Sequence, residues 1–325
     1  MTAGPLVVVG DVLLDVDTRG TVSRATPDGQ APVVDCHERR ERPGGAGLAA
    51  LLAAAPGDRD VVLITGIGDD DTGDRVTAML DGAVTVARLP LDGGTPEKTR
   101  VMTRGQTLVR LDSGPGRVRA DAPLPAAARA ALAGAAAVLV ADYGRGMAVH
   151  PQTRDLLAAL AGRLPVAWDP HPRGGRPVPG ARLVTPNEAE ARKFAAGAET
   201  RPGGEGGTVT CGDAATVGRC AAYLAGAWGV SGVVITLGGN GAVLAAGGRP
   251  PLVVPAPAVA AADTCGAGDS FAAAVARALA DGLPLADSVA LGVHAASSFV
   301  AAGAASGIRW QRGERTCPVA PSARS

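Results

Sequence analysis

The chain of 325 residues carries 31 basic and 31 acidic residues, so its formal net charge is zero. A neutral chain has no overall field that would favour nucleic acid or an anionic membrane as a partner. Five cysteines at unrelated spacings, with no C-x-x-C pair, indicate neither a disulfide framework nor a zinc site. The start, MTAGPLVVVGDVLLD, lacks the basic flank of a signal peptide, and no uncharged apolar run is long enough to span a membrane. We therefore expect a soluble, cytoplasmic protein.

Short apolar runs alternate with helical stretches along the chain. The apolar runs predict strands that start near residues 6, 61, 138, 165, 182 and 232. Apolar positions three to four residues apart predict helices at 45–56, 71–80, 125–136, 151–162, 187–197, 214–227, 268–281 and 285–301. Strands that alternate with helices indicate an α/β fold, with a mostly parallel sheet covered by helices on both faces.

Two regions interrupt this alternation. Residues 15–42 and 84–112 show strand-like polar alternation and turn residues but no helical pattern. We interpret both as strands of one small sheet that stands off the main domain as a lid, with flexible loops as the alternative. The prediction is one domain over residues 1–310, which includes this lid, followed by a disordered tail at 311–325.

The stretch ADTCGAGDSF, residues 262–271, predicts a turn from a strand into a helix. Glycines there let the backbone approach a ligand, and the first turn of a helix offers unpaired N–H groups, so an anion site is expected at Gly266, Ala267 and Gly268. A carboxylate beside a phosphate site is repelled by it, unless it takes a proton from the attacking hydroxyl. Asp269 is therefore a candidate general base, and a plain helix cap is the alternative.

Other phosphate-binding motifs are absent from the sequence. It contains no G-x-x-x-x-G-K-[ST] stretch, no G-x-G-x-x-G after the first strand, and neither the H-R-D nor the D-F-G set of protein kinases. The turn at 263–269 is therefore the main candidate anion site.

Three further segments carry weaker signals. In VTPNEAEARKF, Asn187 and Glu190 share one face of a first helical turn, which suits Mg²⁺ held through water or, alternatively, a capping box. The glycines of VVITLGGNGAVL form either a hairpin turn or a backbone contact to a nucleotide. Asp15 follows the first strand, at the sheet edge where α/β folds bind ligands, and ERPGGAG opens the next helix on a glycine turn.

The order of these motifs resembles the ribokinase (PfkB) family of sugar kinases over residues 6 to about 307. D-T-x-G-A-G-D-x-F matches the most specific family motif, and T-P-N-x-x-E, T-L-G-x-x-G and an early G-G-x-G precede it. Within the family the chain is most similar to bacterial heptose 7-phosphate kinases, in the form of the kinase half of a bifunctional kinase–nucleotidyltransferase, and no second domain is expected here. That similarity lies in GDVLLD (10–15), ERPGGA (41–46), KTRV (98–101), residues 104–112, ADYGRG (141–146), DP (169–170) and TPNEAE (185–190).

The resemblance implies a role for each matching residue. Asp269 would be the base and Gly266, Ala267 and Gly268 the anion hole. ATP and Mg²⁺ would be bound by Asn187, Glu190, Thr236, Gly238, Gly241 and His294, with the metal near Asn187 and Glu190. Sugar hydroxyls would be held by Asp15, Gly44 and Gly45. Charge and position, apart from the resemblance, make Lys98, Arg100, Arg104, Arg110 and Arg145 candidates to bind a substrate phosphate. Family members often bind K⁺, here expected near Asp263 and Gly303, and often form homodimers through the lid.

Three positions depart from the heptose kinases. Leu48 replaces an asparagine that usually touches substrate, while His171 and Arg145 replace lysines. The expected activity is ATP-dependent phosphorylation of the anomeric hydroxyl of a heptose 7-phosphate. The alternatives are a kinase of an unphosphorylated sugar, in which case the lid cations are only a solvated face, and a non-catalytic sugar-binding protein.

Overall fold

A nine-stranded sheet forms the centre of the described part of the chain. The computed structural model describes residues 4–199, 213–260, 263–311 and 314–316. The strand order is β15-β14-β13-β12-β11-β10-β1-β4-β5, parallel from β13 to β5, with β14 and β15 antiparallel at one edge. The bounds are β1 Leu6–Gly10, β4 Val61–Gly66, β5 Thr85–Leu89, β10 Ala137–Ala141, β11 Val166–Asp169, β12 Leu183–Val184, β13 Gly232–Thr236, β14 Ala242–Ala246 and β15 Leu252–Val254.

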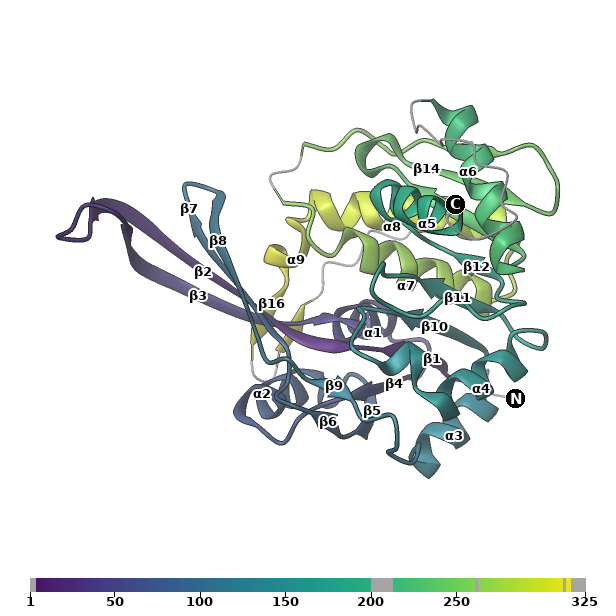
Figure 1. Cartoon of the computed structure of the whole chain (residues 1–325), viewed down its shortest axis with the longest axis horizontal. Helices are drawn as coiled ribbons and strands as arrows, with labels where there is room; N and C mark the ends of the chain where they lie inside the picture. Colours follow the sequence, from purple (N-terminus) through teal and green to yellow (C-terminus); the bar gives the residue numbers. More distant parts are fainter. Residues whose placement is uncertain (1–3, 200–212, 261–262, 312–313, 317–325) are drawn as a thin grey trace.

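Helices cover both faces of this sheet (Figure 1). One apolar core joins alternate strand residues such as Leu6 and Val8 to α1 Ala46–Ala54, α2 Asp71–Leu80, α7 Ala267–Ala280 and α8 Leu285–Ala301. The other joins Val7 and Val9 to α3 Ala126–Ala133, α4 Pro151–Leu160, α5 Glu188–Glu199 and α6 Ala214–Trp228. Because side chains alternate across a strand, each central strand must be apolar on both faces, which gives the continuous apolar runs seen in the sequence. The predicted α/β fold class is confirmed.

A separate four-stranded sheet, which we call the lid, extends from one side of the body (Figure 1). Its order is β3-β2-β7-β8, in which β2 lies antiparallel to β3 and parallel to β7. The strands are β2 Val12–Ala25, β3 Pro32–Gly45, β7 Glu97–Thr103 and β8 Gln106–Ser113. Strand β2 follows β1 after one residue, so the lid begins at the carboxyl edge of the main sheet.

One predicted lid segment belongs to the main sheet instead. We expected lid strands throughout 84–112, but Thr85–Leu89 forms β5, which pairs with β4 at the end of the nine-stranded sheet. An edge strand is less buried on one face than on the other, and here Ala87 and Leu89 are buried on one face while Arg88 on the opposite face is exposed. Its polar alternation therefore looks the same as that of a lid strand.

The remaining described elements are short. Strands β6 Leu91–Asp92 and β9 Arg117–Val118 pair beside the body, and α9 Ala304–Gly307 follows α8. In the predicted tail, β16 Arg309–Gln311 pairs with β17 Glu314–Thr316, and residues 312–313 and 317–325 lie outside the described part. No helix among the described residues is both long and apolar enough to cross a bilayer.

Candidate active site

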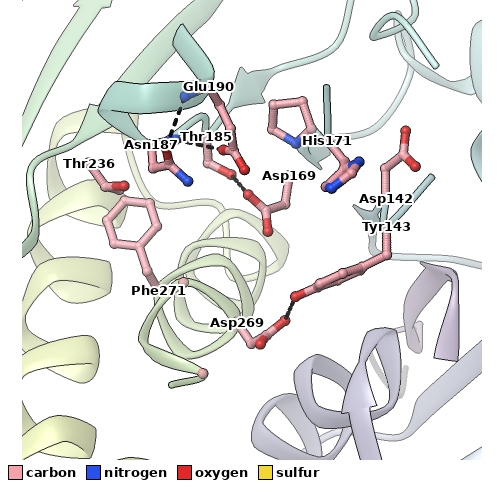
Figure 2. Close-up of a pocket in the computed structure, with 13 residues that line it drawn as sticks. Asp142, Tyr143, Asp169, His171, Thr185, Asn187, Glu190, Thr236, Asp269 and Phe271 are labelled. Carbon is pink, nitrogen blue, oxygen red and sulfur yellow. Dashed lines mark hydrogen bonds between the residues drawn. The ribbon is translucent and has the colours of Figure 1, made fainter. Parts of the chain in front are cut away.

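A cavity of about 200 Å³ opens at the carboxyl ends of the parallel strands (Figure 2). Acidic side chains dominate it, and one wall is the start of α7. The lining residues are Asp142, Tyr143, Asp169, Pro170, His171, Thr185, Asn187, Glu190, Thr236, Gly266, Gly268, Asp269 and Phe271. Since β10, β11, β12 and β13 all end here, the position is the one where α/β folds bind ligands.

The predicted anion site is the first turn of α7. Gly266 precedes the helix with φ 84°, and a Cβ there would lie 2.7 Å from the Leu48 side chain, so glycine is required. A Cβ at Gly268 would meet nothing within 4 Å, which leaves the cavity side of the turn open. The N–H groups of this turn have no intrahelical partner, so they can bind an anion at the cavity wall.

Asp269 lies on the same turn and is 7% exposed. The pKa of its carboxyl is raised to about 7, because burial and the charge of Asp15 raise it by more than a hydrogen bond from Tyr143 and the charge of Lys98 lower it. That hydrogen bond runs from Tyr143 Oη to Asp269 Oδ1 over 2.6 Å. A carboxylate with a pKa near neutrality beside an anion site is suited to general-base chemistry.

Two cavity carboxylates were missed in the sequence. Asp142 directly follows strand β10, and Asp169 is the last residue of β11. Their position at the carboxyl edge of the sheet could have identified them as candidate site residues. Burial and the charge of Asp11 raise the pKa of Asp142 to about 6. The pKa of Asp169 is raised well above its usual value by burial and by the charges of Asp269 and Glu190. The cavity therefore concentrates negative charge and favours a cation within it.

Asn187 and Glu190 form a reciprocal capping box at the start of α5. The Asn187 N–H donates to Glu190 Oε2 over 2.9 Å, and the Glu190 N–H donates to Asn187 Oδ1 over 3.0 Å. Both side chains also line the cavity, and burial raises the pKa of Glu190. Among the described residues no group of three or more His, Cys, Asp or Glu side chains could hold a metal ion. A metal here would therefore rely on few protein oxygens, together with water and ligand oxygens.

The structure divides the predicted nucleotide residues. Thr236, at the end of β13, lines the cavity and forms a β-bridge with Asn187. Gly238 and Gly241 belong to the turn into β14, which confirms the hairpin, and neither lines the cavity. His294 is exposed on α8 and also lies outside the lining.

The predicted sugar-binding residues lie together where the lid joins the body. A Cβ on Gly44 would lie 2.5 Å from Asp15 Oδ2, and one on Gly45 would lie 3.2 Å from the Tyr143 ring. Gly45 also has φ 58°, so both its conformation and its contact require glycine. Burial raises the pKa of Asp15, while the charges of Arg42, Lys98 and Arg100 lower it.

The predicted phosphate-binding cations divide into two groups. Arg100 donates to Asp17 over 2.8 and 3.1 Å, and Arg110 pairs with Asp112 over 2.6 Å. Arg104 is exposed in the turn between β7 and β8. These three cations are therefore paired or distant from the cavity.

Lys98 and Arg145 are placed differently. The Lys98 ammonium lies 5.2 Å from the centre of the Tyr143 ring. Neither cation forms an ion pair within the part of the chain that the structure describes. The pKa of His171 is lowered by burial and then by a group of nearby charges, those of Arg173, Lys98, Lys193 and Arg145. A positive cluster thus surrounds His171 at one side of the acidic cavity.

Leu48, which replaces the expected asparagine, does not line the cavity. It is 1% exposed and packs with Phe299, Ala304 and Ile308 behind the anion turn. Asp263, expected near a K⁺ site, accepts hydrogen bonds from the Cys265 N–H and the Ser306 hydroxyl, and Arg100 Nη1 lies 3.9 Å away. The K⁺ site stays a prediction.

A buried carboxylate on a glycine-flanked helix turn, beneath a β-sheet lid, defines a ribokinase-like phosphotransferase. The fold is similar to that of ribokinase from Thermotoga maritima, with a TM-score of 0.68 and 22% identity over 94% of this chain and 96% of that one. It is also similar to ribokinase from Arabidopsis thaliana complexed with ribose and ATP, with a TM-score of 0.68 and 21% identity over 92% of this chain and 93% of that one. At such identities the likeness shows the fold alone.

The sequence model described as pfkB family carbohydrate kinase matches residues 5–310, so the chain belongs to the pfkB family and is a sugar kinase. It is 50% identical to the bifunctional protein HldE of Streptomyces coelicolor over 98% of this chain and 64% of that protein. It is 35% identical to HldE of Caulobacter vibrioides over 81% of this chain and 53% of that protein. The predicted resemblance is confirmed, and the chain spans about half to two thirds of the length of these relatives.

Proposed function

We propose that this kinase transfers the γ-phosphoryl group of ATP to the anomeric hydroxyl of a heptose 7-phosphate. The observation that supports the proposal is that a candidate general base and a group of cations lie near the same cavity. Asp269 and the start of α7 line the cavity, as does His171, and the cations Lys98 and Arg145 lie close enough to His171 to lower its pKa, although neither of them lines the cavity. A sugar with a hydroxyl at one end and a phosphate at the other fits this division of charge.

Asp269 would act on the acceptor hydroxyl. As the hydroxyl oxygen forms its bond to the γ-phosphorus, its proton passes to the Asp269 carboxylate, and ADP leaves with the electron pair of the broken P–O bond. The N–H groups of Gly268 and its neighbours would stabilise charge on the transferring phosphoryl oxygens. Burial of Asp269 would keep water from its carboxylate, which would limit transfer of the phosphoryl group to a water molecule.

The donor set of the cavity fits Mg²⁺ with ATP. Carboxylate and amide oxygens of Asp169, Glu190 and Asn187 are hard ligands of the kind that Mg²⁺ prefers, usually with several waters retained. Burial raises the pKa values of Asp169 and Glu190, and a cation bound beside them would favour their ionised forms. Bound Mg²⁺ would supply that positive charge.

The similarity to HldE proteins supports a heptose phosphate as the substrate. Support from the chain itself comes from the two cations Lys98 and Arg145, which form no ion pair with any described residue, because a neutral sugar needs no such cations. Each charge-assisted contact is worth about 1.5–3 kcal/mol, so the two together favour a phosphorylated sugar by roughly a hundredfold or more.

A steady-state panel tests the proposal, with ATP and MgCl₂ and with heptose 7-phosphates, fructose and tagatose phosphates, ribose, fructose and a nucleoside. We expect the highest kcat/KM for a heptose 7-phosphate. Arg145→Ala should lower kcat/KM for sugar phosphates by about 10- to 100-fold and leave neutral sugars nearly unchanged. Arg104→Ala, at the exposed lid turn, is the matched control and should change neither.

The alternative, a kinase of an unphosphorylated sugar, predicts a different outcome. If ribose, fructose or the nucleoside gives the highest kcat/KM, the cations near His171 do not select substrate and the substrate assignment is wrong. Equal effects of Arg145→Ala on phosphorylated and neutral sugars would contradict the assigned phosphate position, even if a sugar phosphate wins.

A further inference from the structure

Tyr143 joins two parts of the active site that lie far apart in the chain. It follows strand β10, whereas its hydrogen-bond partner Asp269 lies 126 residues later on α7. The phenol Oη donates to Asp269 Oδ1 over 2.6 Å across the cavity (Figure 2). The bond occupies one carboxylate oxygen and leaves the other for an acceptor hydroxyl.

The Tyr143 backbone is held by a buried carboxylate that has no other assigned role. Asp11 is 2% exposed and accepts the N–H groups of Tyr143, Arg145 and Met147 over 3.1, 2.8 and 2.9 Å. Three such bonds to one side chain fix the path of the turn after β10. The position of the phenol is therefore set by the body of the protein rather than by the lid.

Two lid residues, Gly45 and Lys98, also lie next to the Tyr143 ring. Gly45, at the end of β3, has no side chain where a Cβ would lie 3.2 Å from the ring. From β7, the Lys98 ammonium lies 5.2 Å from the ring centre, within the range of a cation–π contact. The glycine leaves room for the ring, and the lysine lies over its face, at the place where the Tyr143 hydroxyl reaches Asp269.

The hydrogen bond from Tyr143 opposes the surroundings of Asp269, which raise the pKa of its carboxyl. A general base must be ionised, but burial and the neighbouring charge of Asp15 both raise the pKa of Asp269, to about 7. Besides Asp15, the titratable and charged groups that face Asp269 are Tyr143 and Lys98, which both lower its pKa, and the buried Asp169, whose own pKa the charge of Asp269 raises. A hydrogen bond to the charged form of a carboxyl favours that form. Without the phenol, more of the enzyme would carry a protonated, inactive base.

We propose that Tyr143 is the positioning residue for the catalytic base: its hydroxyl orients the Asp269 carboxylate and favours the ionised form. The inference rests on the proposed role of Asp269 and goes beyond it, because it assigns a function to a side chain that need not touch the substrate. It also gives Lys98 a second role, through contact of the lid with the residue that holds the base.

The test is the pH profile of kcat for Tyr143→Phe, measured with saturating ATP, MgCl₂ and heptose 7-phosphate. Activity rises as the base ionises, so loss of the bond should move the midpoint of the acidic limb upward by about one unit. The variant should therefore lose about tenfold near pH 6 and recover at high pH, with KM for ATP unchanged. Tyr223→Phe is the control, because Tyr223 is the second of the two tyrosines and is 40% exposed on α6.

A second measurement strengthens the hydrogen bond instead of removing it, and keeps the hydroxyl. In the Tyr223→Phe background, 3-fluorotyrosine incorporated at position 143 is a stronger hydrogen-bond donor. It should move the acidic midpoint downward, and it keeps the test open if Tyr143→Phe does not fold.

The outcomes separate this inference from the proposed function. An unshifted midpoint in both forms, or a loss of activity by the same factor at every pH, would overturn the role of Tyr143 while Asp269 stays the base. Substantial activity in Asp269→Asn would overturn the base itself, and with it the inference that depends on it.

Discussion

Asp269 combines two properties that an exposed aspartate lacks, a raised pKa and a fixed orientation beside an anion-binding turn. We expect Asp269→Asn to lower kcat by about two to four orders of magnitude, the usual contribution of a general base. The amide keeps the shape of the carboxyl and an oxygen that can accept the Tyr143 hydroxyl, so ATP affinity, measured by calorimetry, should stay near wild type.

Asp281→Asn is the matched control at the far end of the same helix, where the side chain is about half exposed and pairs with Arg59. It should leave kcat unchanged. Turnover of Asp269→Asn within tenfold of wild type would show that the carboxylate is not the base.

At the scale of residues, sequence reasoning finds side chains whose position follows from their own segment. Asp269 and Asn187 belong to this group, because each lies at the start of a helix that its own segment predicts. The role of Tyr143 needs a partner 126 residues away, and the pairing of Arg100 needs Asp17 on another strand. The alternation of side chains along a strand predicts that the lid cations share one face. Which of them form ion pairs with carboxylates depends on the register of β2, β7 and β8.

At the scale of elements, the motif at the start of α5 caps the helix and also lines the cavity. The capping box of Asn187 and Glu190 was an alternative to a metal-binding role, yet the structure shows the box with both side chains in the cavity wall. We expect Glu190→Gln to raise the Mg²⁺ concentration needed for half-maximal activity by several-fold. The glutamine can still accept the Asn187 N–H, so thermal stability should change little.

Glu188→Gln is the control for Glu190→Gln, because Glu188 lies on the same helical turn but pairs with Arg192 in solvent and does not line the cavity. It should leave the Mg²⁺ titration unchanged. The metal-binding role of Glu190 fails if its variant titrates like wild type, or if activity survives EDTA.

The lid is anchored to the anion turn by a buried ion network. Asp17 is fully buried and pairs with Arg42 over 2.7 Å and with Arg100, which also lies 3.9 Å from Asp263. Removing one partner of a buried ion pair typically costs about 3–5 kcal/mol, because the others remain as unpaired buried charges. The network therefore links strands β2, β3 and β7 to the segment that leads into α7.

At the scale of the whole molecule, the order of strands and helices was largely predictable and the assignment of edge strands was not. Eight predicted helices correspond to α1–α8, because each has its own apolar periodicity. Strand β5 was assigned to the lid, since a half-buried edge strand and a lid strand share one pattern of alternation. Which sheet such a strand joins is decided by its partner, and a single sequence does not show the partner.

The lid leaves an apolar surface in solvent, and the expected homodimer through the lid stays a prediction. Strand β8 is the edge of the lid sheet, exposed along its whole length in the single chain (Figure 1). Leu108, Val109 and Leu111 are 44%, 44% and 54% exposed. Val109 and Leu111 alternate with Arg110 and Asp112, so they lie on the opposite face of the strand. An unpaired edge with apolar side chains is a surface that natural proteins usually cover.

We therefore expect the protein to sediment at twice its chain mass of 32.1 kDa, and Leu111→Glu to shift it toward the monomer. A buried glutamate without a partner is costly at an interface, whereas the same charge in solvent is not. Leu252→Glu is the matched control, since Leu252 is 41% exposed on β15, the edge strand of the main sheet. It should leave the mass unchanged. A monomeric wild-type protein, or a dimer that Leu111→Glu leaves intact, would place the subunit contact elsewhere or remove it, and the exposed lid strand would then have to be covered by something other than a second copy.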